Sequence, residues 1–187
     1  MDDSSAAGSA AQYGFKLVTA QNLADPDPLV SLLVTREGET FRPMTPEDFA
    51  RSILAVTLEE PVPFEVRHAF LYARNAMCYG YWYWPVVTLG FEQVLRVADF
   101  ATNVAARANG LKPKWSFERR IDQLIAATII ETERKPVWDY IRKLRNKVTH
   151  PERQLTWGIA QPITDMQLIA EAINALRWVA TPERNKT

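Results

Sequence analysis

The chain has 187 residues, 47% hydrophobic and 24% charged, values that exclude an intrinsically disordered chain and are typical of one globular domain. Its 22 basic and 22 acidic side chains cancel, but they are unevenly distributed. Residues 1–60 hold ten acidic and four basic side chains, and residues 61–187 hold twelve acidic and eighteen basic ones. The C-terminal part can therefore attract a polyanion, because clustered Lys and Arg release counterions from a phosphate backbone.

The single cysteine, Cys78, excludes an intramolecular disulfide and a cysteine-based metal cluster within one chain. Residues 1–12 are acidic, small and polar, unlike a targeting signal. The uncharged run 76–91 is shorter than the roughly 20 apolar residues that a membrane-spanning helix needs. We therefore expect a cytoplasmic protein that does not enter a membrane.

The first part of the chain, residues 1–43, predicts an arm rather than a helix. Residues 1–12 have the composition of a disordered tail, and Asp25-Pro26-Asp27-Pro28 and Glu37-Gly38 are typical of turns. We expect a partly disordered N-terminal arm that lies over the core.

Start and stop signals then predict five to six helices. Thr45 followed by Pro46 begins the first, because a hydroxyl cap and a proline suit the first turn. The expected helices cover about residues 45–59, 64–83, 85–109, 116–130, 136–149 and 164–179, the last capped by Thr164-Asp165. Strand-like alternation never persists, so the fold expected is an all-α antiparallel helical bundle, one domain over 44–181 with a flexible tail over 182–187.

Some faces of these helices can also be predicted. Leu89, Val94, Val97 and Phe100 are expected to share one face of the third helix. On the same helix, we expect Arg96 to form ion pairs with Glu92 and Asp99 rather than leave the two acids as a carboxylate pair.

The helix expected over residues 136–149 carries the most suggestive string, Arg145-Asn146-Lys147-Val148-Thr149-His150. On a helical wheel, Asn146 and His150 fall away from the apolar stripe, so His150 should not face the core. Arg142, Asn146 and His150 are spaced i, i+4, i+8 and line up along the helix, with Arg145 beside them. One surface should therefore collect guanidinium, amide and imidazole groups.

These groups suit chemistry on a phosphodiester. A guanidinium stabilises developing phosphorane charge bidentately, and an imidazole moves protons near neutral pH. Such a scheme needs no metal and no other cofactor. The basic side chains expected to hold an RNA backbone around the motif are Arg142, Lys143, Lys147 and Arg153.

The string from Arg145 to His150 resembles the Arg, polar residue, short spacer, His motif of the HEPN superfamily, whose members are small helical bundles. The segments 71–75, 79–83 and 89–93 also resemble helices of bacterial HEPN-like proteins, and the similarity spans about residues 64–180.

This resemblance implies a metal-independent endoribonuclease, with a toxin or phage-defence role, in which two protomers of a homodimer bring their Arg and His together. Carried over, His150 transfers a proton at the ribose 2′-hydroxyl or the leaving oxygen, Arg145 stabilises the phosphorane, and Asn146 supports one of them. Glu152 departs from superfamily toxins controlled by an antitoxin nucleotidyltransferase, which carry a Tyr there.

Other interpretations stay open at this point. The chain also fits a non-catalytic helical module that binds a protein partner or a nucleotide, in which His150 is only a cation at a helix C-terminus. We expect His68 to be a buried or boundary histidine, and the aromatic run 79–84 to pack in a core rather than stack on nucleobases. The acidic arm can also dock on the basic surface and regulate access to it.

Overall fold

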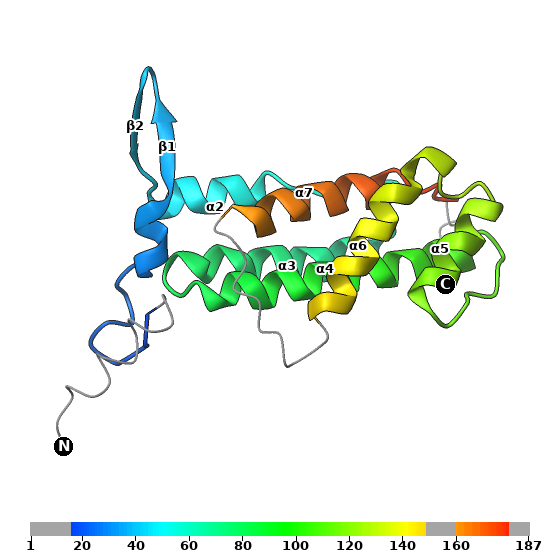
Figure 1. Ribbon diagram of the computed structural model, residues 1–187, viewed down its shortest axis with the longest axis horizontal. Helices are drawn as coiled ribbons and strands as arrows, with labels where there is room; N and C mark the ends of the chain where they lie inside the picture. Colours follow the sequence, from blue (N-terminus) through cyan, green and yellow to red (C-terminus); the bar gives the residue numbers. More distant parts are fainter. Residues whose placement is uncertain (1–15, 149–159, 180–187) are drawn as a thin grey trace, which may run out of the picture.

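A computed structural model describes residues 16–148 and 160–179 (Figure 1). Its elements, in chain order, are η1 (Pro28–Leu32), β1 (Val34–Glu37), β2 (Thr40–Pro43), α2 (Pro46–Leu54), α3 (Phe64–Cys78), η2 (Tyr79–Tyr81), α4 (Pro85–Ala108), α5 (Phe117–Ala126), η3 (Thr132–Arg134), α6 (Lys135–Val148) and α7 (Gln161–Asn174). The prediction of a mainly helical fold is confirmed. None of these helices is long and apolar enough to cross a membrane.

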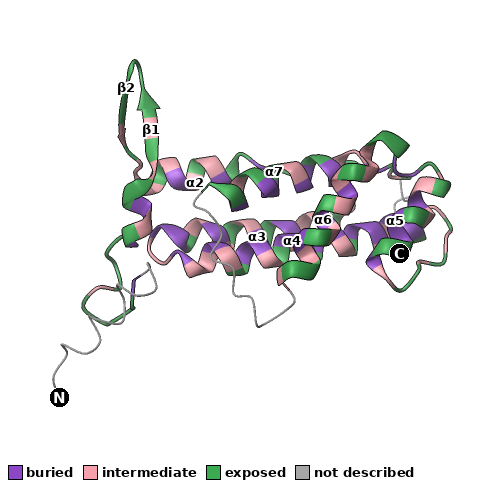
Figure 2. Cartoon of the chain, viewed as in Figure 1, coloured by how far each residue is buried: buried purple, intermediate pink, exposed green. Residues whose placement is uncertain are grey.

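The helices form two layers with α4 at the centre. In Figure 1, α3 and α4 run antiparallel along the long axis, α2 and α7 lie above them, and α6 crosses α4 obliquely. Helix α4 contacts α3, α5, α6 and α7, so every later helix packs on it. Figure 2 shows buried residues where these elements face one another. The largest fully buried side chains include Trp84, Trp138, Phe49, Phe70 and Phe91.

The arm is joined to the helices through Asp27, which is only 1% exposed. Its carboxylate accepts hydrogen bonds from the backbone N–H groups of Leu29 (3.0 Å) and Trp84 (3.0 Å). Its own N–H donates to the carbonyl of Tyr81 at 2.9 Å. A buried carboxylate needs such donors, since an unbonded charge would be costly to desolvate. The arm is therefore anchored at Asp27 against the start of α4.

The β1–β2 hairpin is a difference from the sequence prediction. Its strands pair antiparallel, with Val34 opposite Pro43 and Glu37 opposite Thr40. Gly38 has φ +63°, a conformation that glycine adopts without strain, so the turn expected at Glu37-Gly38 is present. The strands were missed because each has only four residues and is mostly exposed, which leaves no alternation of apolar and polar side chains to detect.

Two predicted helix starts are confirmed by their caps. The Thr45 side chain accepts the N–H of Asp48 at 3.2 Å, and the Asp48 carboxylate accepts the N–H of Thr45 at 3.2 Å. This is a complete capping box. The Ser116 hydroxyl likewise accepts the N–H of Arg119 at 3.2 Å at the start of α5. The prediction was wrong about the end of the first helix, since α2 stops at Leu54.

The predicted start of the last helix was also wrong. Helix α7 begins at Gln161, and Pro162 occupies its first turn. Asp165 is buried inside the helix, where its carboxylate accepts hydrogen bonds from the Tyr140 hydroxyl (3.0 Å) and the Gln161 amide (2.9 Å). The sequence Thr164-Asp165 looks the same whether Asp165 caps a helix or, as here, bonds to a residue on another helix.

The face predicted for α4 is confirmed for three of its four residues, since Leu89, Val97 and Phe100 line one groove that does not include Val94. Val94 and Val97 are buried, but Leu89 is 58% and Phe100 is 41% exposed. The buried stripe contains Val87, Phe91, Val94, Leu95 and Ala98. Leu89 and Phe100 lie instead along an open groove between α3 and α4. Helix α3 buries one face and exposes residues such as Tyr72.

The close contact between α3 and α4 depends on Gly90. A Cβ atom placed at this position would lie 2.4 Å from Cγ of Met77, 3.0 Å from the carbonyl oxygen of Ala73 and 3.1 Å from the backbone nitrogen of Met77. The two backbone atoms cannot move without shifting α3. Only a residue without a side chain fits here.

We predict that Gly90→Ala lowers the free energy of unfolding by about 1–2 kcal/mol, because overpacking costs more than the roughly 1 kcal/mol that alanine gains in helix propensity. Urea denaturation followed by circular dichroism would measure it. Gln93→Ala, an exposed position on the same helix, should change stability by less than about 0.5 kcal/mol. A Gly90→Ala protein as stable as the parent would contradict the close-packing argument.

Candidate functional site

A pocket of about 320 Å³ opens where α4, the start of α5 and α6 meet. Three residues singled out from the sequence, Arg142, Arg145 and Asn146, lie in its wall. The full lining is Asp99, Trp115, Ser116, Phe117, Glu118, Arg142, Arg145 and Asn146. The helical spacing of these three therefore collects them at one hollow of the surface, as the wheel predicted.

The other predicted residues are placed differently. Lys143 and Lys147 are exposed on α6 outside this lining. His150 and Arg153 lie outside the described residues, so the proposed imidazole and one proposed RNA contact have no described position. The expectation that His150 avoids the core stays a prediction.

Arg145 is held by neighbours on two sides. Its Nη2 lies 3.3 Å from Oδ2 of Asp99, and its Nη1 donates to Oδ1 of Asn146 at 3.4 Å. The side chain is still 36% exposed, so its guanidinium reaches the pocket. Asn146 thus contacts Arg145, one of the two residues that the HEPN resemblance implies it supports.

Behind Asp99 lies a second arginine, Arg120, which is only 4% exposed. It pairs with the Asp99 carboxylate and donates to the Thr102 hydroxyl (2.9 Å) and the Lys114 carbonyl (2.6 Å). Burial lowers the pKa of Arg120, and the positive charge of Arg145 lowers it further. Asp99 therefore sits between two guanidinium groups and bonds to both.

Arg142 completes the charged wall. Its Nη1 lies 3.5 Å from Oε1 of Glu118, and its Nε lies 3.7 Å from Oδ1 of Asp139. The pocket wall thus presents two arginines and two carboxylates, and Arg120 adds a further positive charge behind Asp99. This arrangement can bind a phosphate group bidentately, but only in exchange for part of its existing ion pairs.

Three residues of this region were missed from the sequence: Asp99, Arg120 and Trp115. The expectation that Arg96 pairs with Asp99 was wrong, because Asp99 points to Arg120 and Arg145 instead. A signal was present, since Arg120 falls on the buried stripe of α5 with Phe117, Ile121 and Leu124. A charged side chain on an apolar stripe indicates a buried partner on another element.

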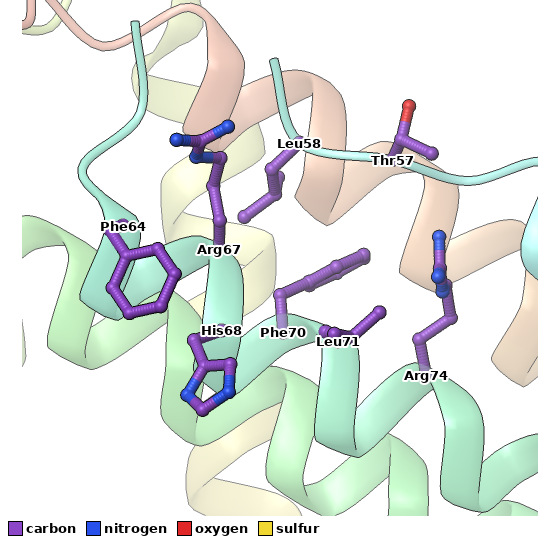
Figure 3. A pocket seen from close by; sticks show the side chains of 8 residues that line it. All are labelled: Thr57, Leu58, Phe64, Arg67, His68, Phe70, Leu71 and Arg74. Atoms are coloured by element: carbon purple, nitrogen blue, oxygen red, sulfur yellow. The ribbon is translucent and has the colours of Figure 1, made fainter. Parts of the chain in front are cut away.

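A second pocket, of about 410 Å³, lies on α3 and contains two other arginines (Figure 3). Arg74 donates to the carbonyls of Val56 (3.0 Å) and Leu54 (3.3 Å) and so binds the end of α2. Arg67 pairs with Glu60 at 2.6 Å. These guanidinium groups join α3 to the segment after α2, which is a structural role.

His68 lines that pocket as a half-buried boundary residue, as expected. Its ring stacks on Phe64, with centroids 5.2 Å apart, and meets the edge of Tyr72 at 4.5 Å. Figure 3 shows it beside Phe64 on α3. Aromatic packing therefore accounts for this histidine.

The aromatic run 79–84 divides between core and surface. Tyr81 and Trp84 are buried and pack near Phe49, at ring distances of 6.0 Å and 6.2 Å. Trp82 and Tyr83 line a shallow hollow with residues of the arm, and Tyr79 is exposed. The prediction of core packing is confirmed for Tyr81 and Trp84, and Trp82 is half-buried against the core.

No protein-family model, curated protein or solved structure matches the chain. The HEPN resemblance therefore rests on the residues quoted for it. Within the part of the chain that the structure describes, no group of three or more His, Cys, Asp or Glu side chains is arranged to hold a metal ion.

We predict that Asp99→Asn lowers the free energy of unfolding by about 2–3 kcal/mol, because it leaves the Arg120 guanidinium buried without its carboxylate. The loss is below that of a fully buried pair because carbonyl and hydroxyl acceptors remain. Chemical denaturation would measure it. Asp139→Asn, which removes only the weak pairs with Lys135 and Arg142 at 3.7 Å, should cost less than about 1 kcal/mol. Equal effects would contradict the central role of Asp99.

Proposed function

We propose that this protein is a metal-independent endoribonuclease of HEPN type in which Arg145, Asn146 and His150 act on RNA. One observation carries the proposal: the guanidinium of Arg145 reaches a pocket on α6 while Asp99 and Asn146 hold it in place. His150 follows the last residue of α6 by two positions. Preorganised donors of this kind are what charge stabilisation in a transition state requires.

The chemistry proposed is an internal transfer within the RNA strand. The ribose 2′-oxygen forms a bond to the adjacent phosphorus, and the bond from that phosphorus to the 5′-oxygen breaks. His150 accepts the 2′-hydroxyl proton or delivers one to the 5′-oxygen. Arg145 donates two hydrogen bonds to the non-bridging oxygens as their charge grows. The products are a 2′,3′-cyclic phosphate and a 5′-hydroxyl, and solvent water accepts or supplies the proton at the oxygen that His150 does not serve.

Substrate binding is assigned to the basic side chains around this point. Arg142 contributes from the pocket wall, and Lys143 and Lys147 from exposed positions of α6. Arg153 is included from the sequence. Exposed lysines attract a phosphate backbone without reading its sequence. A toxin or phage-defence role in the cytoplasm belongs to the same proposal.

The second candidate is a non-catalytic helical module that binds a protein or a nucleotide. The observation that favours it is the charge balance of the pocket, where Asp99 and Glu118 already pair with Arg145 and Arg142. In that case the arginines hold α6 against α4 and α5, and cleavage is absent. The two candidates differ in activity, so a cleavage assay separates them.

The nuclease proposal includes a homodimer, because the HEPN resemblance implies that two protomers bring their Arg and His together. The open groove between α3 and α4 supports it, since Leu89, Phe100 and Tyr72 expose apolar surface there. Phe100 of the groove follows Asp99 of the pocket directly on α4. Burying the groove between two copies would place both pockets near the contact.

We predict that purified protein cleaves single-stranded RNA in EDTA, and that Arg145→Ala and His150→Ala each slow cleavage by about 100-fold or more. Gel analysis of labelled RNA would measure the rates. Arg51→Ala, an exposed arginine on α2, is the matched control and should cleave like the parent. If all four proteins cleave equally, the activity is a contaminant. If none cleaves, the binding module is the better candidate.

We also predict that Leu89→Arg converts the dimer into monomers and reduces cleavage at equal protein concentration, because it places a charge in the apolar contact. Light scattering would give the solution mass. Leu32→Arg, an equally exposed leucine in η1, should leave the mass unchanged. A monomeric parent protein, or a Leu89→Arg variant that stays dimeric, would exclude this interface.

A further inference from the structure

Trp115 is the most exposed large apolar side chain in the described residues, at 85%. It belongs to the connection between α4 and α5 and directly precedes Ser116, the cap of α5. Exposing an indole gives up the burial energy that a tryptophan normally contributes. Nothing in the packing of the core requires a tryptophan at this position.

The backbone around Trp115 is nevertheless fixed. The Gln123 side chain accepts the N–H of Lys114 at 3.1 Å and donates to the carbonyl of Lys112 at 3.0 Å. Arg120 donates to the carbonyl of Lys114 at 2.6 Å. The indole is therefore presented from a held segment, and little backbone order has to be gained when a ligand contacts it.

The same pocket that contains Trp115 contains Arg142, Arg145 and Asn146. Arg120 connects the two sides, since it holds the carbonyl of Lys114 and also the carboxylate that pairs with Arg145. The pocket has a volume of about 320 Å³, at the lower end of the range for small-ligand sites, roughly 300–1,000 Å³. An aromatic face beside guanidinium groups matches a nucleotide, which has both a flat base and a phosphate.

We propose that Trp115 is a stacking platform for a nucleobase of single-stranded RNA whose neighbouring phosphate lies at Arg145. Lys112 and Lys114, both exposed, contact the phosphates on either side. The inference rests on the proposed function for the identity of the ligand. Stacking on an aromatic face accepts any base, so the site selects single strands over duplexes, whose bases already stack on each other.

The experiment measures binding without cleavage. A His150→Ala background is used, and fluorescence anisotropy follows a labelled oligouridine of about twelve nucleotides, a length within the usual site size for such proteins. The same strand annealed to its complement and a strand of equal length with abasic riboses serve as the other two probes. They separate base stacking from attraction to phosphates.

Trp115→Ala should weaken binding of the single strand by about tenfold to a hundredfold, the usual effect of losing one base-stacking aromatic. Trp115→Phe should restore most of the affinity, because a phenyl ring still stacks. Binding of the duplex and of the abasic strand should be the same in all three proteins. Tyr79 is an exposed aromatic residue that does not line the pocket, so Tyr79→Ala is the control and should bind like the parent.

The inference is overturned if Trp115→Ala binds the single strand as tightly as the parent, or weakens all three probes alike. It is also overturned if the parent does not bind single-stranded RNA, which leaves the indole as a contact for a protein. Because the probes are not cleaved, the result is independent of activity. If the parent never cleaves RNA but Trp115→Ala still loses base-dependent binding, the stacking platform is supported and the nuclease proposal is rejected.

Discussion

The site depends on one buried guanidinium, that of Arg120. Burial makes its charge expensive unless every N–H group finds an acceptor, and Asp99, Thr102 and Lys114 supply these acceptors from two other parts of the chain. Satisfying this one charge fixes the angle between α4 and α5 and the path of the segment between them. Asp99 then has a second oxygen directed at Arg145, which links α6 to the same network.

This arrangement explains how a pocket with balanced charge can still suit a phosphate. Asp99 is shared by Arg120 and Arg145, so neither guanidinium has this carboxylate to itself. An anion entering beside Arg145 meets donors that are already oriented, and the cost of ordering them is met during folding. The exposed groove of α3 and α4 includes Phe100, which follows Asp99 directly in the chain.

Sequence reasoning succeeded where the cause of a feature is local. Caps at Thr45 and Ser116, and the alignment of Arg142, Arg145 and Asn146 on one face, follow from interactions within one or two turns. It failed where a residue's partner lies on an element that is distant in the sequence. Asp165 looked like a cap but bonds to Tyr140, and Asp99 looked like a partner of Arg96 but pairs with Arg120 of α5 and Arg145 of α6. The β1–β2 hairpin was not predicted for another reason: its strands are short and exposed, so they carry no alternation of apolar and polar residues.

The geometry at position 120 also limits which residues can occupy it. The guanidinium reaches a hydroxyl, a carbonyl and a carboxylate in three directions from one rigid plane. A lysine has equal charge, but its single ammonium is a compact centre on a flexible stem and cannot span those acceptors together. A change from arginine to lysine, which surface positions tolerate freely, would at position 120 disconnect the α4–α5 segment from α6.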